Sequence, residues 1–319
     1  MSTASSSSST APVGVILAAG KGTRIRPFSE TTPKPLLPIL DRPLMAWQIE
    51  QLKTLGVERI VVVIGHLGHK VVQTLGDGSR YGVQLTYVEQ DEMLGIAHAV
   101  GQLEAHLDGP FLLFLGDIFF ETVQLDRMLE RISEPDVQGV LAVMREPNPD
   151  LIRRNFTVQT DERGFVRRVI EKPRHPKSDL KGCGLYMFDP AIFDSIRRTP
   201  RTALRDEYEL TDAIQIFIED GYGVVPAEVI ERDLNLSTPA DLLHLNMHAL
   251  DRSDREEYIA PDAVVEVGAV VQHSVIMAGA SVPAGAVLDQ CVVLPGERAP
   301  LGTHRRCILS TGRSTPCDD

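Results

Sequence analysis

A six-residue repeat near the C-terminus leaves few folds open to that part of the chain. Apolar side chains recur at every sixth position, and small residues stand two positions before four of them: Val264, Val270, Ile276, Val282, Leu288 and Leu294, with Gly268, Ser274, Ala280 and Ala286. Hexapeptide periodicity is typical of a parallel β-helix, whose coils have three short sides. At roughly 18 residues per coil, the repeat predicts two to three coils. The period fades beyond Pro300, so Thr303–Asp319 is expected to be a loose tail.

Upstream of the repeat, short apolar runs alternate with segments of helical spacing. Such alternation is typical of βαβ units, and we predict an α/β domain with a Rossmann-like, mostly parallel sheet. Strands are predicted at Val13–Leu17, Ile60–Ile64, Gln84–Glu89, Phe111–Leu115 and at four places within 139–188, and helices at Pro43–Leu55, Ile96–Leu107, Pro190–Arg197, Leu210–Glu219 and Pro239–Leu250. In such sheets ligands bind beyond the carboxyl ends of the strands.

These patterns divide the 319 residues into three parts. Residues 1–12 are rich in serine and predict a disordered tail. Residues 13–250 form the α/β domain, and residues 251–319 form the β-helix domain with its loose C-terminal tail. Because a short β-helix with an apolar stripe often serves assembly, we expect a homo-oligomer.

Composition excludes several classes of protein. A formal net charge of -12 argues against binding to nucleic acid or to an anionic membrane. No apolar run approaches the roughly 18 residues that cross a bilayer. The four cysteines lack metal-binding spacing, so a reducing cytoplasm is the expected location.

The loop after the first predicted strand has the opposite charge. Between Lys21 and Arg42 the chain carries five basic and two acidic residues, a local charge of +3. Gly20 and Gly22 let backbone N–H groups approach phosphate oxygens without a Cβ in the way. The spacing matches neither a Walker A loop nor a dinucleotide fingerprint, where a third glycine would stand at Ile25. A basic glycine-rich loop on an acidic protein is the pattern expected for a polyphosphate ligand.

Motifs in this loop and further along resemble those of the sugar-nucleotide pyrophosphorylases, most closely the long-type glucose-1-phosphate thymidylyltransferases with a C-terminal left-handed β-helix. The resemblance rests on six segments in order: Leu17–Arg24 (LAAGKGTR), Pro33–Pro38 (PKPLLP), Gly95–Ala99 (GIAHA), Leu115–Asp117 (LGD), Glu171–Pro173 (EKP) and Thr238–Leu242 (TPADL). It implies transfer of a nucleotidyl group from an NTP, dTTP or UTP, to a sugar-1-phosphate, glucose-1-phosphate above all, with release of pyrophosphate.

The resemblance also implies roles for residues at the nucleotide. Arg24 and Lys34 would act in catalysis by neutralising the triphosphate. The nucleotide-binding backbone would come from Ala19, Gly20, Gly22, Thr23 and Gly95. Gln90 would pair with the pyrimidine, because an amide offers a donor and an acceptor to the O4 and N3–H of thymine or uracil.

Two oxygen ligands for Mg²⁺ follow from the same resemblance. Asp117 lies just past the predicted strand Phe111–Leu115, where a hard cation shared with substrate phosphates would bind. Asn235 stands where many relatives have aspartate, and it contributes a neutral carbonyl oxygen. The site then carries one negative charge fewer.

For the sugar phosphate, the resemblance points to Glu171, Lys172 and the acidic pair Glu207 and Glu209. Which member of that pair faces the sugar stays open. Phe156–Thr157 replaces the Tyr-Gly of many relatives, so the identity of the sugar is not carried over.

Three other functions are compatible with the sequence. A mannose-1-phosphate guanylyltransferase would use GTP and also carries such a β-helix. A non-catalytic homologue would sense sugar nucleotides, although Arg24, Lys34, Asp117 and Lys172 are all present. An acyltransferase in the β-helix would use His273 as its base; we expect His273 to be a turn residue.

Overall fold

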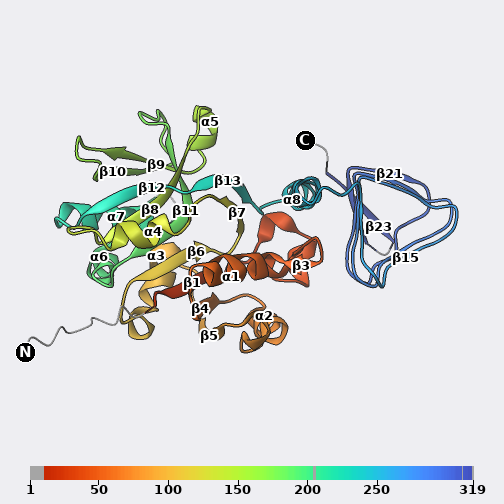
Figure 1. Ribbon diagram of the computed structural model, residues 1–319, viewed down its shortest axis with the longest axis horizontal. Coiled ribbons are helices and arrows are strands. Elements are labelled where there is room, and N and C mark those ends of the chain that lie inside the picture. The colour runs from red at the N-terminus through yellow and green to blue at the C-terminus, as the bar shows by residue number, and fades with distance from the viewer. Residues whose placement is uncertain (1–10, 204–205, 311, 318–319) are drawn as a thin grey trace, which may run out of the picture. The chain divides into compact units, whose positions relative to one another are not determined.

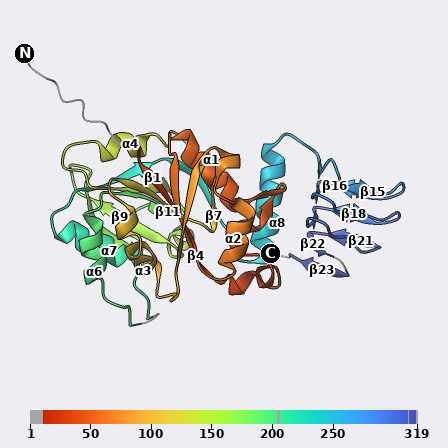
Figure 2. The ribbon, with the colours of Figure 1, turned by 90° about the horizontal axis from the view of Figure 1, so that it is seen from below.

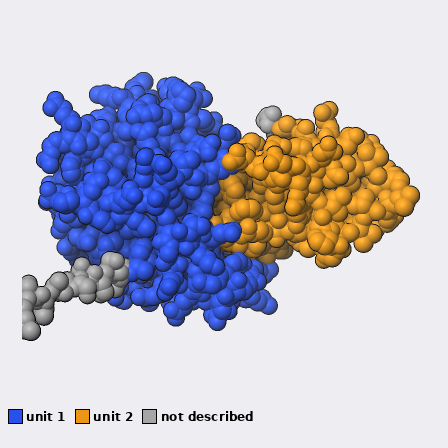
Figure 3. All heavy atoms as spheres, in the orientation of Figure 1, with its two compact units in different colours: residues 1–19, 48–115, 120–233 blue, residues 20–47, 116–119, 234–319 orange. Residues whose placement is uncertain are grey.

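The computed structural model describes residues 11–203, 206–310 and 312–317. Its contacts divide the chain into two compact units, each assembled from several segments (Figure 3). Unit 1 holds residues 1–19, 48–115 and 120–233, and unit 2 holds residues 20–47, 116–119 and 234–319. Most of the predicted disordered tail lies outside the described residues.

Unit 1 is built on one mixed sheet in the strand order β10-β9-β11-β6-β1-β4-β5. Off this path, β8 pairs with β11, and β12 pairs with β8. Strands β6, β1, β4 and β5 run parallel, and β11 is antiparallel to β6 and β8. The strand bounds are β1 Val13–Ala18, β4 Arg59–Ile64, β5 Gln84–Glu89, β6 Phe111–Leu115, β8 Gly139–Arg145, β9 Phe156–Thr160, β10 Val166–Glu171, β11 Leu180–Phe188 and β12 Val224–Glu228. The predicted Rossmann-like sheet is confirmed, and every strand predicted in this region exists.

The helices predicted in unit 1 exist, although one of them is broken in two. The predicted helix Ile96–Leu107 is two pieces, α3 (Ile96–Gly101) and a 3₁₀ turn (Glu104–His106). The remaining helices are α1 (Leu44–Thr54, whose first residues belong to unit 2), α2 Gly68–Leu75, α4 Arg127–Ile132, α5 Pro149–Ile152, α6 Ile192–Arg198 and α7 Leu210–Glu219. Helices α2, α4 and α5 were not predicted.

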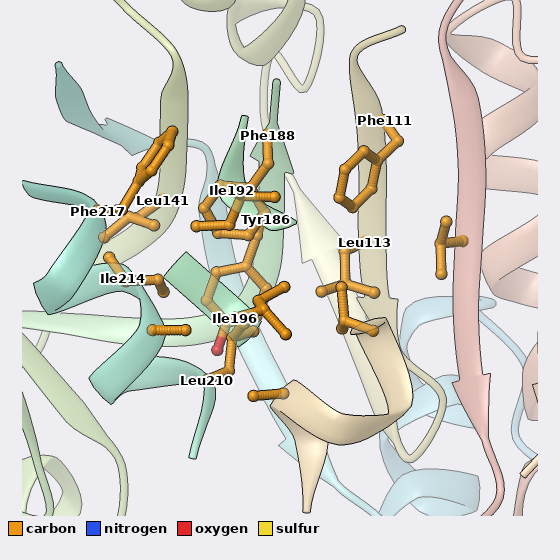
Figure 4. Close-up of a cluster of buried hydrophobic side chains, with 14 of the residues drawn as sticks. Phe111, Leu113, Leu141, Tyr186, Phe188, Ile192, Ile196, Leu210, Ile214 and Phe217 are labelled. Carbon is orange, nitrogen blue, oxygen red and sulfur yellow. The ribbon is translucent and has the colours of Figure 1, made fainter. Parts of the chain in front are cut away.

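The core beneath α3, α6 and α7 explains why these elements assemble. Phe111 and Phe188 come from neighbouring strands, and Ile192, Ile214 and Phe217 come from the covering helices (Figure 4). All five are buried. Fully burying side chains of this kind contributes roughly 1.5–3 kcal/mol each, so this face of the sheet is a rigid base for residues at its ends.

Unit 2 begins with the basic loop. The loop contains three 3₁₀ turns, Thr23–Ile25, Phe28–Glu30 and Lys34–Leu36. A hairpin of two short strands follows, β2 (Pro38–Ile39) and β3 (Arg42–Pro43). The chain then enters α1, which leads back to unit 1. Helix α8 (Pro239–Arg252) is capped at its N-terminus by Thr238, which forms a reciprocal capping box with Asp241. Strand β7 (Ile118–Thr122) pairs with β13 (Ile230–Asn235).

The rest of unit 2 is the β-helix. Its strands form three sides of a triangle seen down the axis in Figure 1, and Figure 2 shows the coils stacked. One side is β14-β17-β20-β22, the second is β15-β18 and the third is β16-β19-β21. The bounds are β14 Tyr258–Ile259, β15 Val264–Val265, β16 Val270–Gln272, β17 Val275–Ile276, β18 Ser281–Val282, β19 Val287–Asp289, β20 Val292–Val293, β21 Thr303–Arg305 and β22 Cys307–Ser310. Three coils confirm the predicted β-helix.

The register of the repeat differs from the prediction. Val264 pairs with Ser281 and Val270 with Val287, so one coil takes 17 residues rather than three full sets of six. The strict period therefore holds only within the second coil, where Ile276, Val282 and Leu288 are fully buried. In the first coil the predicted positions face outward, and Val264 is 57% exposed and Val270 42% exposed.

The C-terminal segment is not the loose tail that the fading period predicted. Strand β21 extends the third side of the triangle, and β22 continues the first. Strand β23 (Arg313–Pro316) then turns back antiparallel to β22 and covers its edge. A free strand edge exposes unpaired backbone groups, and the final hairpin satisfies them.

The predicted domain boundary lies between residues 250 and 251. The two contact-defined units divide the chain at other positions, so this boundary stays a prediction. Among the described helices, none combines the length and apolarity required to cross a membrane.

Candidate active site

In unit 2 the candidate phosphate-binding residues lie on the loop that follows β1. Gly22 has a left-handed φ of 60°, and a Cβ there would lie 3.2 Å from the Cβ of Ser29. The Ser29 hydroxyl donates a hydrogen bond of 2.7 Å to the Gly22 carbonyl. These contacts fix a tight turn, and Gly20 and Thr23 lie exposed on either side of it.

Lys34 and Asp117 form the central ion pair of the site. The Lys34 Nζ lies 2.6 Å from the Asp117 Oδ2, although 83 residues separate them. The Lys34 side chain is only 11% exposed, whereas that of Asp117 is 37% exposed. The structure thus brings together the predicted phosphate-binding cation and the predicted metal ligand, and the carboxylate keeps a face toward solvent.

Within unit 2, hydrogen bonds of the segment 235–237 connect Arg24 and Asn235 to the region of this pair. The Arg24 Nη2 donates to the Ser237 Oγ at 3.4 Å, just before α8. The Leu236 N–H donates to the Asp117 carbonyl at 2.8 Å, which places the neighbouring Asn235 beside Asp117. Ser237 was not singled out from the sequence, because a lone serine before a helix reads as a capping residue.

The donor set fits Mg²⁺. Asp117 and Asn235 offer hard oxygen atoms, and Mg²⁺ is usually bound by one or two carboxylates together with substrate phosphates and water. Across residues 11–203, 206–310 and 312–317, no three His, Cys, Asp or Glu side chains gather into a complete protein cage. A metal held here would need oxygen atoms from a substrate.

In unit 1 the candidate base-reading residue is Gln90, directly after β5. Its side chain is buried, and its Nε2 lies 3.3 Å from the Nδ1 of His98 on α3. His98 in turn stacks on Tyr208, with ring centroids 6.2 Å apart. His98 is therefore a packing residue that holds the Gln90 amide. Ala19, at the end of β1, is buried against Gly65, where a Cβ would lie 2.8 Å from the Ala19 carbonyl oxygen.

Gly95 anchors the acidic segment of unit 1. Its φ is +108°, and a Cβ there would lie 2.5 Å from the Tyr208 carbonyl oxygen. On either side of this close approach, the Tyr208 N–H donates to the Leu94 carbonyl at 2.7 Å and the Ala97 N–H to the Tyr208 carbonyl at 3.0 Å. Gly95 and Glu207 are neighbours here, because Glu207 also borders that Cβ position.

The predicted sugar-phosphate residues Glu171 and Glu209 both act electrostatically on Tyr186. Burial raises the pKa of Tyr186, and the charges of Glu171, Cys183 and Glu209 raise it further. Glu209 is buried, whereas Glu207 is only half-buried. Lys172 has a left-handed φ of 43°, and its Nζ lies 3.5 Å from the Glu171 Oε1.

Thr157 does not protrude from the sheet. It is fully buried, and its hydroxyl donates to the Leu180 carbonyl at 2.8 Å. Phe156 packs over Gly182, where a Cβ would lie 1.9 Å from the ring. The substitution of Tyr-Gly is thus absorbed by the packing of β9 against β11.

A buried ion pair in unit 1 was missed from the sequence. Lys181 on β11 and Asp233 on β13 are 2.6 Å apart, with side chains 6% and 3% exposed. Burial raises the pKa of Asp233, and Lys181 opposes that shift. The Asp233 Oδ2 has no hydrogen-bond partner. A lysine in a strand is usually read as solvent-facing, so only the pairing of β11 with its neighbours reveals it.

The family model of the nucleotidyl transferases matches residues 13–250. The chain belongs to this family.

Two curated proteins show which members it resembles. It is 36% identical to the low-salt glycan biosynthesis nucleotidyltransferase Agl11 of Haloferax volcanii, over 79% of this chain and 71% of the relative. It is 33% identical to a glucose-1-phosphate thymidylyltransferase of Streptomyces griseus, over 82% of this chain and 75% of the relative. A solved structure of UDP-glucose pyrophosphorylase complexed with UDP-glucose shares the fold, with a TM-score of 0.67, 21% identity and coverage of 76% of this chain and 100% of that one. The predicted membership among the sugar-1-phosphate nucleotidyltransferases is confirmed.

Proposed function

We propose that the chain transfers a nucleotidyl group from dTTP or UTP to glucose-1-phosphate. An oxygen of the sugar phosphate attacks the α-phosphorus of the NTP. The bond between that phosphorus and the oxygen bridging to the β-phosphate breaks, and pyrophosphate leaves with the bonding electrons. Such a transfer requires positioning and charge neutralisation rather than a covalent enzyme intermediate. The observation that carries the proposal is the 2.6 Å pair of Lys34 and Asp117 beside a glycine-rich turn.

In this proposal unit 2 holds the triphosphate. Backbone N–H groups of Gly20, Gly22 and Thr23 bind phosphate oxygens, and Arg24 adds a fixed positive charge. Lys34 is the catalytic cation, because its side chain is held near Asp117 and has little freedom to leave. A buried cation that already points at the reacting phosphates stabilises the charge that develops in the transition state.

Asp117 and Asn235 would hold Mg²⁺ in this proposal, Asp117 through its carboxylate and Asn235 through a carbonyl oxygen that adds no charge. When bound, the metal would act as a Lewis acid that neutralises phosphate oxygens. Lys34, which pairs with Asp117, adds a second positive charge beside it.

Unit 1 supplies the recognition of base and sugar in this proposal. Gln90, held by His98, pairs with the pyrimidine, with Ala19 and the backbone at Gly95 lining the nucleotide. Lys172 binds the sugar phosphate, and Glu171 and Glu209 accept hydrogen bonds from sugar hydroxyls. Glu209 is assigned over Glu207 because it is the buried member of the pair and because its charge, like that of Glu171, raises the pKa of Tyr186.

Pyrophosphate release with a panel of nucleotides and sugar phosphates tests the proposal. We expect turnover with dTTP or UTP and glucose-1-phosphate, dependent on Mg²⁺. Preference for GTP with mannose-1-phosphate would replace the substrate assignment by a guanylyltransferase. Absence of turnover with every pair, in a folded sample supplied with Mg²⁺, would contradict the proposed function.

A homo-oligomer and a cytoplasmic location complete the proposal. All four cysteines lie within the described residues, are buried and form no disulfide there, which supports a reducing compartment. Light scattering on the full chain checks the assembly, and a monomer at micromolar concentration would contradict it.

The geometry of His273 favours a turn residue over the base of an acyltransferase. It has a left-handed φ of 42° between β16 and β17, and its Nε2 lies 3.2 Å from the Asp251 Oδ1.

A further inference from the structure

The turn between β2 and β3 carries an aspartate that bonds to the β-helix. The Asp41 Oδ1 accepts the backbone N–H of Ala278 at 2.9 Å. The Tyr258 hydroxyl donates to the Asp41 Oδ2 at 3.3 Å. Burial and the Asp41 charge raise the pKa of Tyr258, so the hydroxyl keeps the proton that it donates. Both carboxylate oxygens of a residue on the phosphate-binding loop are thus used by the β-helix.

Helix α8 holds the same turn from another side. Asn246 is fully buried, its Oδ1 accepts the Leu40 N–H at 3.0 Å, and its Nδ2 donates to the Pro38 carbonyl at 3.1 Å. A buried amide with both ends bonded fixes the backbone that it touches, because breaking either bond would leave a buried polar group unpaired. The hairpin therefore has two independent attachments within unit 2.

The loop, α8 and the β-helix also share one hydrophobic core. Leu37 and Ile39 come from the loop, Leu242 comes from α8, and Val275 and Met277 come from the β-helix. All five are buried. A module added only for assembly or for a second reaction would not need to contribute core side chains to the phosphate-binding loop.

Short connections lead from this core to the ion pair of Lys34 and Asp117. Lys34 begins the 3₁₀ turn that ends at Leu36, directly before the buried Leu37. On the other side, the Trp47 Nε1 donates to the Ile39 carbonyl at 3.4 Å, and the Trp47 ring meets the edge of Phe119 at 5.6 Å. Phe119 is two residues beyond Asp117, so the hairpin contacts the elements that carry both partners.

We propose that the β-helix is the support that holds the phosphate-binding loop in its working geometry, with Asp41 as the positioning residue. The expected loss of rate rests on the proposed function. The expected change in the structure of the loop rests on the contacts within unit 2 alone. Misplacing a catalytic group by about 1 Å can cost on the order of 10²-fold in rate. Loss of Asp41 should therefore affect the nucleotide step and leave sugar-phosphate binding unchanged.

The test compares Asp41→Gly with Asp136→Gly in the full chain. Both aspartates have a φ of 67°, which glycine adopts freely, and Asp136 is exposed in unit 1. For Asp41→Gly we expect kcat/KM for the NTP to fall about tenfold and KM for the sugar phosphate to stay within about twofold. Asp136→Gly should match the wild type. Asp41→Asn, which keeps an acceptor for the Ala278 N–H, should recover most of the lost rate.

Amide hydrogen exchange supplies a readout that needs no turnover. In Asp41→Gly we expect faster exchange over residues 34–44 and unchanged exchange in the strands of unit 1. Unchanged exchange over 34–44, or an equal change in Asp136→Gly, would overturn the proposal. A rise in KM for the sugar phosphate as large as that for the NTP would also overturn it, since the effect would then not be confined to the nucleotide. A wild-type chain without turnover would refute the proposed function, while the exchange experiment would still decide the role of the β-helix.

Discussion

The two units hold their candidate site residues by different means. In unit 1, Gln90 follows β5, Glu171 ends β10 and Glu209 precedes α7, so each is placed by an element packed on one large sheet. In unit 2, Arg24 and Lys34 lie on 3₁₀ turns of three residues each rather than at the end of a strand. Those turns obtain their rigidity from a core that α8 and the β-helix complete.

This contrast separates two ways of building precision. A residue at the end of a buried strand inherits its position from the register of the sheet, and few further contacts are needed. A residue on a loop needs attachments of its own, such as the Lys34–Asp117 pair and the bonds of Asp41. Substitutions in unit 1 should therefore act through the stability of the sheet or through one substrate contact, whereas those in unit 2 should act on the loop.

The largest expected effect is on the stability of unit 1. Lys181→Met leaves Asp233 buried without its partner, and losing one member of a buried ion pair costs about 3–5 kcal/mol of unfolding free energy. Chemical denaturation measures it, with the exposed Lys177→Met as the matched control. The double variant Lys181→Met/Asp233→Leu should regain most of the loss. If the double variant is as unstable as the single one, the pair is not the cause.

Next in size is the loss of the catalytic cation in unit 2. Lys34→Ala should lower kcat by on the order of 10² to 10³, the effect of removing one preorganised donor at a transition state. Lys21→Ala removes an exposed lysine of the same loop and should change kcat by less than about threefold. Steady-state pyrophosphate release compares the two variants, and equal losses would show that only the general charge of the loop matters.

A smaller effect is expected at the sugar. Glu209→Gln should raise KM for the sugar phosphate about tenfold, since a hydrogen bond to a charged group contributes roughly 1.5–3 kcal/mol. KM for the NTP should not change. Glu207→Gln is the matched comparison and should shift KM by less than about twofold, because Glu207 borders Gly95 and is only half-buried. The reverse order of the two effects would reassign the sugar contact to Glu207.

The smallest expected effect is a pH dependence in unit 1. Burial raises the pKa of Asp212, and the Glu209 charge raises it further. A carboxyl group whose pKa is raised in the folded state lowers the stability of the fold when it ionises. This loss of stability is absent below the ordinary pKa and complete above the raised one. The unfolding free energy of Asp212→Asn relative to the wild type should therefore increase by roughly 0.5 kcal/mol from about pH 3 to about pH 7. A gain that is equal at both pH values would contradict the assigned cause.

Much of unit 1 was predictable because its strands are continuous apolar runs. Ile60–Ile64 and Phe111–Leu115 are buried central strands whose composition leaves little choice of structure. The position of Asp117, two residues past such a strand, was predictable for the same reason, whereas its role as a metal ligand stays a prediction. The Lys181–Asp233 pair was not, because its partners lie 52 residues apart and only the folded sheet brings them together.

In unit 2 the β-helix was predictable and its register was not. The period of six points to the fold, but Val264 and Val270 face outward because one coil takes 17 residues. The contact of Asp41 with Ala278 spans 237 residues and leaves no trace in either local pattern. Local sequence specifies the elements, whereas contacts at long separation decide which side chains support the site.

Transfer of a label from the α-phosphate of the NTP tests the proposed function most directly. The full chain is incubated with α-labelled dTTP or UTP, glucose-1-phosphate and Mg²⁺, and the labelled products are separated. The proposed reaction predicts label in the NDP-sugar, in amounts equal to the pyrophosphate released and absent without the sugar phosphate. Label that stays in the NTP, or that appears in a free nucleotide whether or not the sugar phosphate is present, would contradict it.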